Sequence, residues 1–314
     1  MAASRLPRID LARGLALWAM VVFHLIWDLA QFGWIDSETP YTPVVHWFGH
    51  AIAISFLLLV GYSLVLAERA YGPLWRSAKF WRRWGLIVLS SAAISAVSFW
   101  LFPASPIFFG ILHCIALSSL VALPFLQAPV ILTLGCGGLA LLAPHFFASS
   151  LFDAKIFWWT GLGTFQPASN DFRPLLPWLA FVLFGVVLGR WKAQGGLIPL
   201  YRNDGPVFRA LTFCGRHSLA FYLIHQPLLF GLFTLLGLFV TPTPNAKVFM
   251  RQCAVQCVNE GAEAGICEKS CACVVERART DGLWTALARD QLTPREKSIL
   301  HDEAMACYAK AGGK

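Results

Sequence analysis

Long apolar runs dominate this chain, and they limit what it can fold into. Each run is close to the length of about 20 residues that an α-helix needs to cross the hydrocarbon core of a bilayer. Hydrophobic residues make up 57% of the sequence and charged residues 13%, whereas charged residues average about 25% of soluble domains. We therefore predict an all-α, polytopic membrane helix bundle. The runs indicate about seven spans, near residues 12–33, 46–67, 84–102, 108–126, 129–146, 175–190 and 215–240.

Basic residues gather at the ends of alternate runs. One group lies at residues 5–13, a second at 69–83 and a third at 190–209, while the loop at 34–45 contains two acidic residues and no basic one. Because loops that stay in the cytoplasm carry an excess of Lys and Arg, the N-terminus is predicted to be cytoplasmic. After seven spans, the C-terminus lies on the opposite side. The same anchoring role accounts for the net charge of +8, so we expect a lipid bilayer as partner and no nucleic acid.

The first span carries three ionisable residues, Arg13, His24 and Asp28. Such residues are costly in lipid and usually functional. Eleven residues separate Arg13 from His24, which places them on one helix face, about 16 Å apart along the axis. Asp28 follows His24 at i+4, within hydrogen-bonding reach. A histidine supported by a carboxylate suits general-base catalysis, and an arginine at the membrane rim suits a phosphate.

This spacing suits a substrate with an anionic head and a long arm, the shape of a coenzyme A thioester. The alternative for His24 and Asp28 is a buried structural pair.

Three more basic residues at cytoplasmic helix ends are candidates for binding the nucleotide phosphates, or else membrane anchors: Arg82, Arg83 and Arg216.

Polar residues elsewhere at membrane depth are candidates for binding an acceptor. His113 and His225 lie inside predicted spans, where a structural hydrogen bond is the alternative, and Asp171 begins the sequence DFRPLLPW at the outer mouth. A metal is not expected, because His46 and His50 have no third ligand at a recognisable spacing.

The segment RIDLARGLALWAMVVFHLIWDL resembles the first helix of the bacterial relatives of heparan-α-glucosaminide N-acetyltransferase. The resemblance continues at residues 56–70, 107–126, 171–190 and 215–229, and so covers residues 5 to about 240. It implies a membrane acetyltransferase that takes acetyl-CoA as co-substrate from the cytoplasm. The acetyl group would pass to an acceptor on the other side, a sugar or glycan.

The chain departs from the lysosomal enzyme of this family in one respect. That enzyme has its active histidine in the loop after the first helix, where this chain offers Asp36, Glu38 and His46 without a clear counterpart. The spacing of Arg13 and His24 is similar to that of transmembrane acyltransferases that O-acetylate polysaccharides, which implies that His24 is the active histidine. A proton-coupled transporter and a non-catalytic envelope scaffold are the alternatives, and homo-oligomerisation is an open option.

The composition changes after residues 241–245, which divides the chain into a membrane domain at 1–240 and a polar tail at 246–314. The tail holds six of the nine cysteines. Two Cys-x(3)-Cys pairs on antiparallel helices would face each other and form two disulfides, leaving a third pair. An even number of cysteines favours an oxidising compartment, here the periplasm beyond a bacterial inner membrane; a cytoplasmic zinc site is the alternative. Of fifteen connectivities, we predict Cys253–Cys271, Cys257–Cys267 and Cys273–Cys307.

A final helix is also expected in the tail. Thr293 and Glu296, three residues apart before an apolar run, have the pattern of a capping box.

Overall fold

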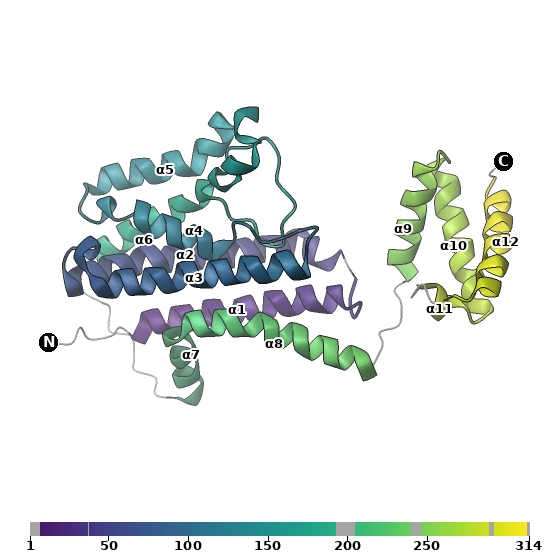
Figure 1. Cartoon of the computed structure of the whole chain (residues 1–314), viewed down its shortest axis with the longest axis horizontal. Coiled ribbons are helices and arrows are strands. Elements are labelled where there is room, and N and C mark those ends of the chain that lie inside the picture. The colour runs from purple at the N-terminus through teal and green to yellow at the C-terminus, as the bar shows by residue number, and fades with distance from the viewer. Residues whose placement is uncertain (1–6, 37, 193–204, 240–245, 289–291, 313–314) are drawn as a thin grey trace. The chain divides into compact units, whose positions relative to one another are not determined.

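The computed structural model describes residues 7–36, 38–192, 205–239, 246–288 and 292–312, and this part of the chain contains helices and no strand. The chain divides into two compact units, one formed by residues up to Val21 with Trp47–His225, the other by Val22–His46 with Gln226–Lys314. The helices of the apolar region are labelled in Figure 1: α1 (Pro7–Gln31), α2 (Pro43–Tyr71), α3 (Ala78–Leu101), α4 (Ile111–Val121), α5 (Val130–Phe147), α6 (Leu175–Lys192), α7 (Pro206–Arg216) and α8 (Ser218–Phe239).

Apolar helices form in all seven predicted runs. Within the described residues, five of them (α1, α2, α3, α5 and α8) are long and apolar enough to cross a membrane, and α4 and α6 are shorter. The chain is therefore a multi-pass membrane protein. The largest difference from expectation is the fourth run, predicted at 108–126, because α4 begins only at Ile111 and ends at Val121. A second difference is α7, a separate helix that precedes the last span.

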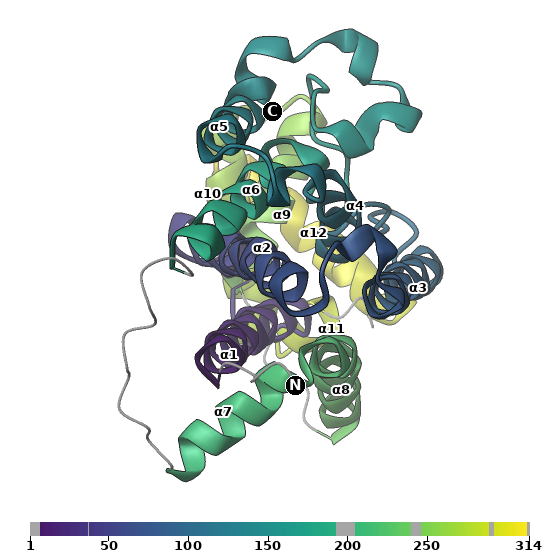
Figure 2. The same ribbon diagram turned by 90° about the vertical axis from the view of Figure 1, so that its left-hand side faces the viewer.

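In the first unit, α6 lies between α5 and α2, as the end-on view of Figure 2 shows. Gly61 of α2 and Gly185 of α6 face the backbone carbonyls of Val182 and Leu58, and a methyl group at either glycine would overlap those carbonyls. Such glycines let two membrane helices approach closely. Val182 of α6 is fully buried, so this short helix lies at the centre of its unit.

Glycines also join α7 to the first part of α1. Gly14 of α1 faces the carbonyl of Leu211, and Gly215 of α7 faces the carbonyl of Asp10. The segment of α1 that contains Arg13 is therefore held in place by a neighbouring helix.

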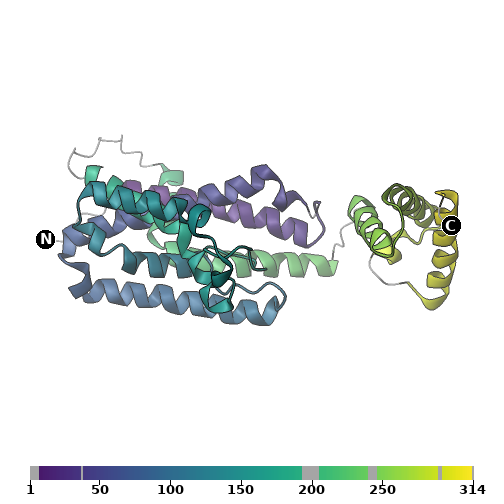
Figure 3. The ribbon, with the colours of Figure 1, turned by 90° about the horizontal axis from the view of Figure 1, so that it is seen from above.

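The tail is helical. Its helices are α9 (Ala246–Asn259), α10 (Ala264–Thr280), α11 (Trp284–Ala288) and α12 (Pro294–Lys310), with α10 between α9 and α12 (Figures 1 and 3). Thr293 and Glu296 form the expected capping box at the start of α12. The boundary predicted at 241–245 lies outside the described residues.

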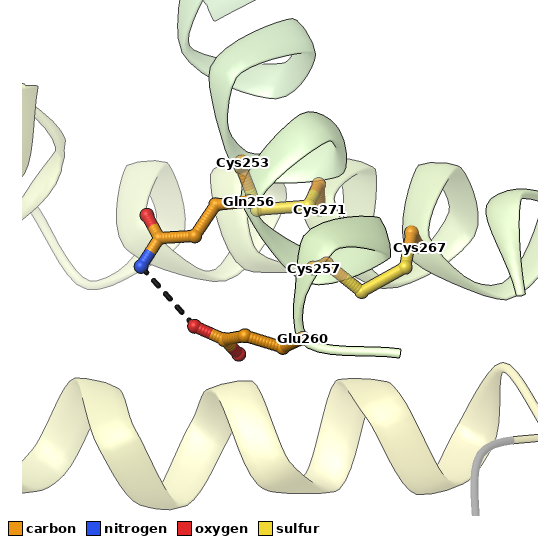
Figure 4. The surroundings of a disulfide bond; sticks show 6 residues. All are labelled: Cys253, Gln256, Cys257, Glu260, Cys267 and Cys271. Atoms are coloured by element: carbon orange, nitrogen blue, oxygen red, sulfur yellow. Dashed lines mark hydrogen bonds between the residues drawn. A yellow bond between two sulfur atoms is a disulfide. The ribbon is translucent and has the colours of Figure 1, made fainter. Parts of the chain in front are cut away.

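Three disulfides join the predicted cysteine pairs, two of which follow from the spacing and one of which is the pair that remained. Cys253–Cys271 and Cys257–Cys267 link α9 to α10, with Cα–Cα distances of 6.0 and 5.8 Å (Figure 4). Cys273–Cys307 links α10 to α12 at 5.7 Å. These distances are ordinary for disulfides, and each link joins neighbouring helices.

Candidate active site

The first unit contains a cavity of about 320 Å³ between α2, α3, α4, the first part of α1 and the first turns of α8. Its walls are mostly apolar. Three cationic side chains from two helices also line it: Arg13, Lys79 and Arg83.

The helical repeat explains which residues face the cavity. From Phe56 to Tyr71, the lining residues of α2 recur every three or four positions, so they share one face of the helix. This face extends about 22 Å along α2. Lys79, Arg83 and Ile87 follow the same rule on α3. The basic residues of α3 lie near its N-terminus, close in sequence to the end of α2. Phe56 of α2 and Ile87 of α3, which lie farther from this connection, are apolar.

Arg13 is held by polar contacts beside this cavity. Its Nη2 donates a hydrogen bond to Ser63 Oγ at 2.5 Å, and its Nη1 lies 3.5 Å from Asp10 Oδ1. Ser63 Oγ in turn donates to the carbonyl of Leu59 on its own helix. Asp10 is buried and its charge attracts both Arg13 and Arg83. A carboxylate therefore partly balances the two guanidinium groups.

Only some of the basic residues proposed from sequence line this cavity. Arg13 and Arg83 line it, whereas Arg82 and Arg216 do not. Arg82 is one residue from Arg83 and hence rotated by about 100° around α3. Sequence reasoning missed Lys79, although its i,i+4 relation to Arg83 was an available signal. It also missed Ser63, a hydroxyl within an apolar run, for which no pattern pointed to the cavity.

The predicted catalytic pair lies in the second unit. His24 is half-buried, with its ring 5.5 Å from that of Phe23. Asp28 is only 3% exposed. Asp28 Oδ1 accepts a hydrogen bond from Gln226 Nε2 of α8 at 2.9 Å. The i,i+4 spacing keeps His24 and Asp28 within reach of each other along α1, and a catalytic role for this pair stays a prediction.

The polar residues predicted to bind an acceptor make structural contacts. His113 Nδ1 accepts a hydrogen bond from the Gly110 amide at 3.2 Å, and its Nε2 lies 3.3 Å from Ser95 Oγ. Asp171 Oδ2 accepts from the Ile111 amide at 2.8 Å, which caps the start of α4. These contacts favour the structural alternative for His113 and give Asp171 a capping role that its sequence did not reveal.

His225 contacts its own helix. Its Nδ1 lies 2.7 Å from the carbonyl oxygen of Tyr222, and Tyr222 lines the cavity. The last predicted acceptor contact is therefore adjacent to a cavity residue along α8.

Apolar helices that surround a cavity with cationic and apolar sides are the arrangement that these residues build in a multi-pass membrane protein. The family model "Heparan-alpha-glucosaminide N-acetyltransferase, catalytic" matches residues 5–227, more than half of the chain. The chain belongs to this family and is a membrane acetyltransferase-like protein, which confirms the resemblance predicted from its motifs. The comparisons with curated proteins and with solved structures found no match.

Proposed function

We propose that this protein is an integral membrane acetyltransferase that uses acetyl-CoA from the cytoplasmic side. The observation that carries the proposal is the cavity in which Arg13, Lys79 and Arg83 stand beside apolar walls. Coenzyme A has phosphate groups at one end and a long, thin arm that ends in the thioester. Guanidinium and ammonium groups are common phosphate ligands, and the apolar walls suit the arm.

The lining residues support this fit in length as well as in charge. The face of α2 that lines the cavity extends about 22 Å, with Ser63 and Tyr71 adding hydroxyl groups between apolar neighbours. Basic residues at the start of α3 belong to the connection that charge distribution assigns to the cytoplasm. This orientation lets the nucleotide stay in the aqueous phase while the acetyl group enters the bundle.

His24 is our candidate for the general base. An acceptor hydroxyl or amine attacks the thioester carbonyl carbon, His24 accepts the proton, and the carbon–sulfur bond breaks to release coenzyme A as its thiolate, which then takes up a proton. The alternative route passes through a transient acetyl-histidine. Arg13 and His24 share helix α1, and the rise between them is about 16 Å. We infer a sugar or glycan acceptor, because the family's catalytic model is named for a glucosaminide.

We further propose a bacterial inner membrane location with a periplasmic tail. The three disulfides of the tail support an oxidising compartment, and the basic connections support a cytoplasmic N-terminus.

The proposal is tested with the purified full-length protein in detergent. Isothermal titration calorimetry compares acetyl-CoA with S-acetylpantetheine, which keeps the arm and thioester but lacks the nucleotide. We expect acetyl-CoA to bind at least about tenfold more tightly, equivalent to about 1.4 kcal/mol. Transfer of labelled acetyl groups to glucosamine is then measured in proteoliposomes. Equal affinity for the two thioesters, or proton-coupled uptake of solute without acetyl-CoA turnover, would contradict the proposal.

A further inference from the structure

The hydrogen-bonded pair formed by the buried Asp28 and the half-buried Gln226 is the strongest feature that the proposed acetyl-CoA cavity does not use. Asp28 lies in the last turn of α1, and Gln226 lies in the first half of α8. Gln226 Nε2 donates to Asp28 Oδ1 at 2.9 Å, although 198 positions separate the two residues in sequence. Both residues belong to the second unit.

The pair leaves two buried acceptor atoms without a hydrogen bond, Asp28 Oδ2 and Gln226 Oε1. Buried side-chain oxygens nearly always have a partner, and an unsatisfied one lowers the stability of the fold. Lipid offers no donor to replace it. Asp28 forms no ion pair within the described part of the chain either. A contact that served only to join two helices would be expected to satisfy its own polar atoms.

We propose that Asp28 and Gln226 form an acceptor subsite that binds two neighbouring hydrogen-bond donors of a sugar. This inference rests on the proposed acetyltransferase function and extends it to a residue that nothing so far has assigned, Gln226. Adjacent hydroxyl or amino groups on one sugar ring supply two donors a short distance apart. Asp28 Oδ2 and Gln226 Oε1 supply two acceptors on side chains that are already hydrogen-bonded to each other.

Gln226 acts in this subsite in two ways. Its Nε2–H group holds Asp28 Oδ1 and so fixes the direction of Oδ2, which makes Gln226 a positioning residue for the carboxylate. Its own Oε1 accepts the second donor. Replacing Gln226 by leucine removes both effects, whereas replacing it by glutamate keeps the side-chain size but removes the donor and adds a second negative charge.

The test uses the full-length protein in detergent, with glucosamine as the probe. Isothermal titration calorimetry gives the Kd for glucosamine and, separately, the Kd for acetyl-CoA. We expect Gln226→Leu and Gln226→Glu each to raise the Kd for glucosamine at least about tenfold while the Kd for acetyl-CoA stays unchanged. Gln256→Leu is the matched control, because Gln256 is exposed on α9 and contacts Glu260; it should change neither Kd.

Three results would overturn the inference. The first is that the wild-type protein does not bind glucosamine, and the second is that both Gln226 variants bind it as tightly as wild type. The third is a parallel loss of both ligands together with a lower melting temperature in both Gln226 variants, which would show a packing role. Failure of the proposed function is a separate result, the absence of acetyl-CoA binding in the wild-type protein.

Discussion

The guanidinium of Arg13 on α1 donates a hydrogen bond to the hydroxyl of Ser63 on α2 at 2.5 Å, across 50 positions of sequence. The Ser63 hydroxyl in turn donates a hydrogen bond to the carbonyl of Leu59. Both Arg13 and Ser63 line the cavity. The hydroxyl of Ser63 and the carboxylate of Asp10 thus orient the cation that we assign to a phosphate of coenzyme A.

Removing that hydroxyl should weaken acetyl-CoA binding without unfolding the protein. We expect Ser63→Ala to raise the Kd for acetyl-CoA several-fold, since a hydrogen bond to a charged group contributes about 1.5–3 kcal/mol and some of it is recovered by solvent or ligand. Ser63→Thr keeps the hydroxyl and should retain most of the affinity. Ser55→Ala is the control, because Ser55 lies on the same helix, its hydroxyl donates to the Ala51 carbonyl and it is not among the residues that line the cavity. Calorimetry that gives Ser63→Ala and Ser55→Ala the same Kd would refute this role.

The two neighbouring arginines of α3 should differ sharply. Arg83 lines the cavity and Arg82 does not, so Arg83→Ala should raise the Kd for acetyl-CoA at least about tenfold. Arg82→Ala should have no effect. The loss in the Arg83 variant should shrink at high ionic strength, because salt screens charge–phosphate attraction. Equal effects of the two substitutions would mean that the phosphates bind elsewhere.

His24→Ala should abolish acetyl transfer while acetyl-CoA still binds. General-base catalysis contributes about 10²–10⁴ in rate, so the labelled-acetyl assay should lose at least two orders of magnitude. His145→Ala is the control, since His145 is exposed near the end of α5. Wild-type rates in the His24 variant would exclude both the general-base route and the acetyl-histidine route.

The disulfides should support the tail rather than the catalytic core. Cys273 and Cys307 are 34 residues apart, and removing a disulfide that closes such a loop typically costs about 2–4 kcal/mol. The double variant Cys273→Ser/Cys307→Ser should therefore lower the melting temperature of the tail transition in the full-length protein. Acetyl-CoA binding should stay unchanged. If the double variant lost acetyl-CoA binding, the tail would be part of the binding machinery.

Two glutamates of the tail should respond to pH in opposite directions. Hydrogen bonding to Asp281 raises the pKa of Glu303. The stability that its protonated form contributes is therefore fully present below the usual glutamate pKa of about 4.3. It is lost as pH rises through the raised pKa. Hydrogen bonds from Thr293 lower the pKa of Glu296, so its stability is present above the usual pKa and is lost as pH falls through the lowered one.

Melting temperatures measured from about pH 2.5 to about pH 7, on both sides of the usual glutamate pKa of about 4.3, test both signs. Glu303→Gln should stabilise the tail at neutral pH, where the two carboxylates repel, and should reduce its loss of stability with rising pH. Glu296→Gln should destabilise the tail at neutral pH. A change in melting temperature of the opposite sign in either variant would show that the hydrogen bonds do not set these two pKa values.

Much of the architecture was predictable from local sequence. Apolar runs of suitable length located the membrane helices, since hydropathy needs no knowledge of neighbours. The i,i+4 spacing of the cysteines on α9 and α10 indicated which of them could face each other, and the structure joins those same pairs. Thr293 and Glu296 indicated the start of α12, because a capping box is complete within four residues and needs no distant partner.

The candidate site was only partly predictable. Arg13, His24 and Asp28 were identified because ionisable residues are conspicuous in an apolar helix, and Arg83 because it ends a basic connection. Lys79 and Ser63 became part of the cavity only when α1, α2 and α3 packed together.

What the sequence alone determined is therefore what depends on neighbours within a few turns: the helices, their polarity, the disulfide spacing and the family motifs. Tertiary structure decided which side chains meet. It gave Asp28 a hydrogen-bond partner on α8, Gln226, and it placed Asp171 so that it caps α4. The physical reason is that a carboxylate accepts whichever donor the packed helices bring within about 3 Å, and helical periodicity does not specify donors on distant helices.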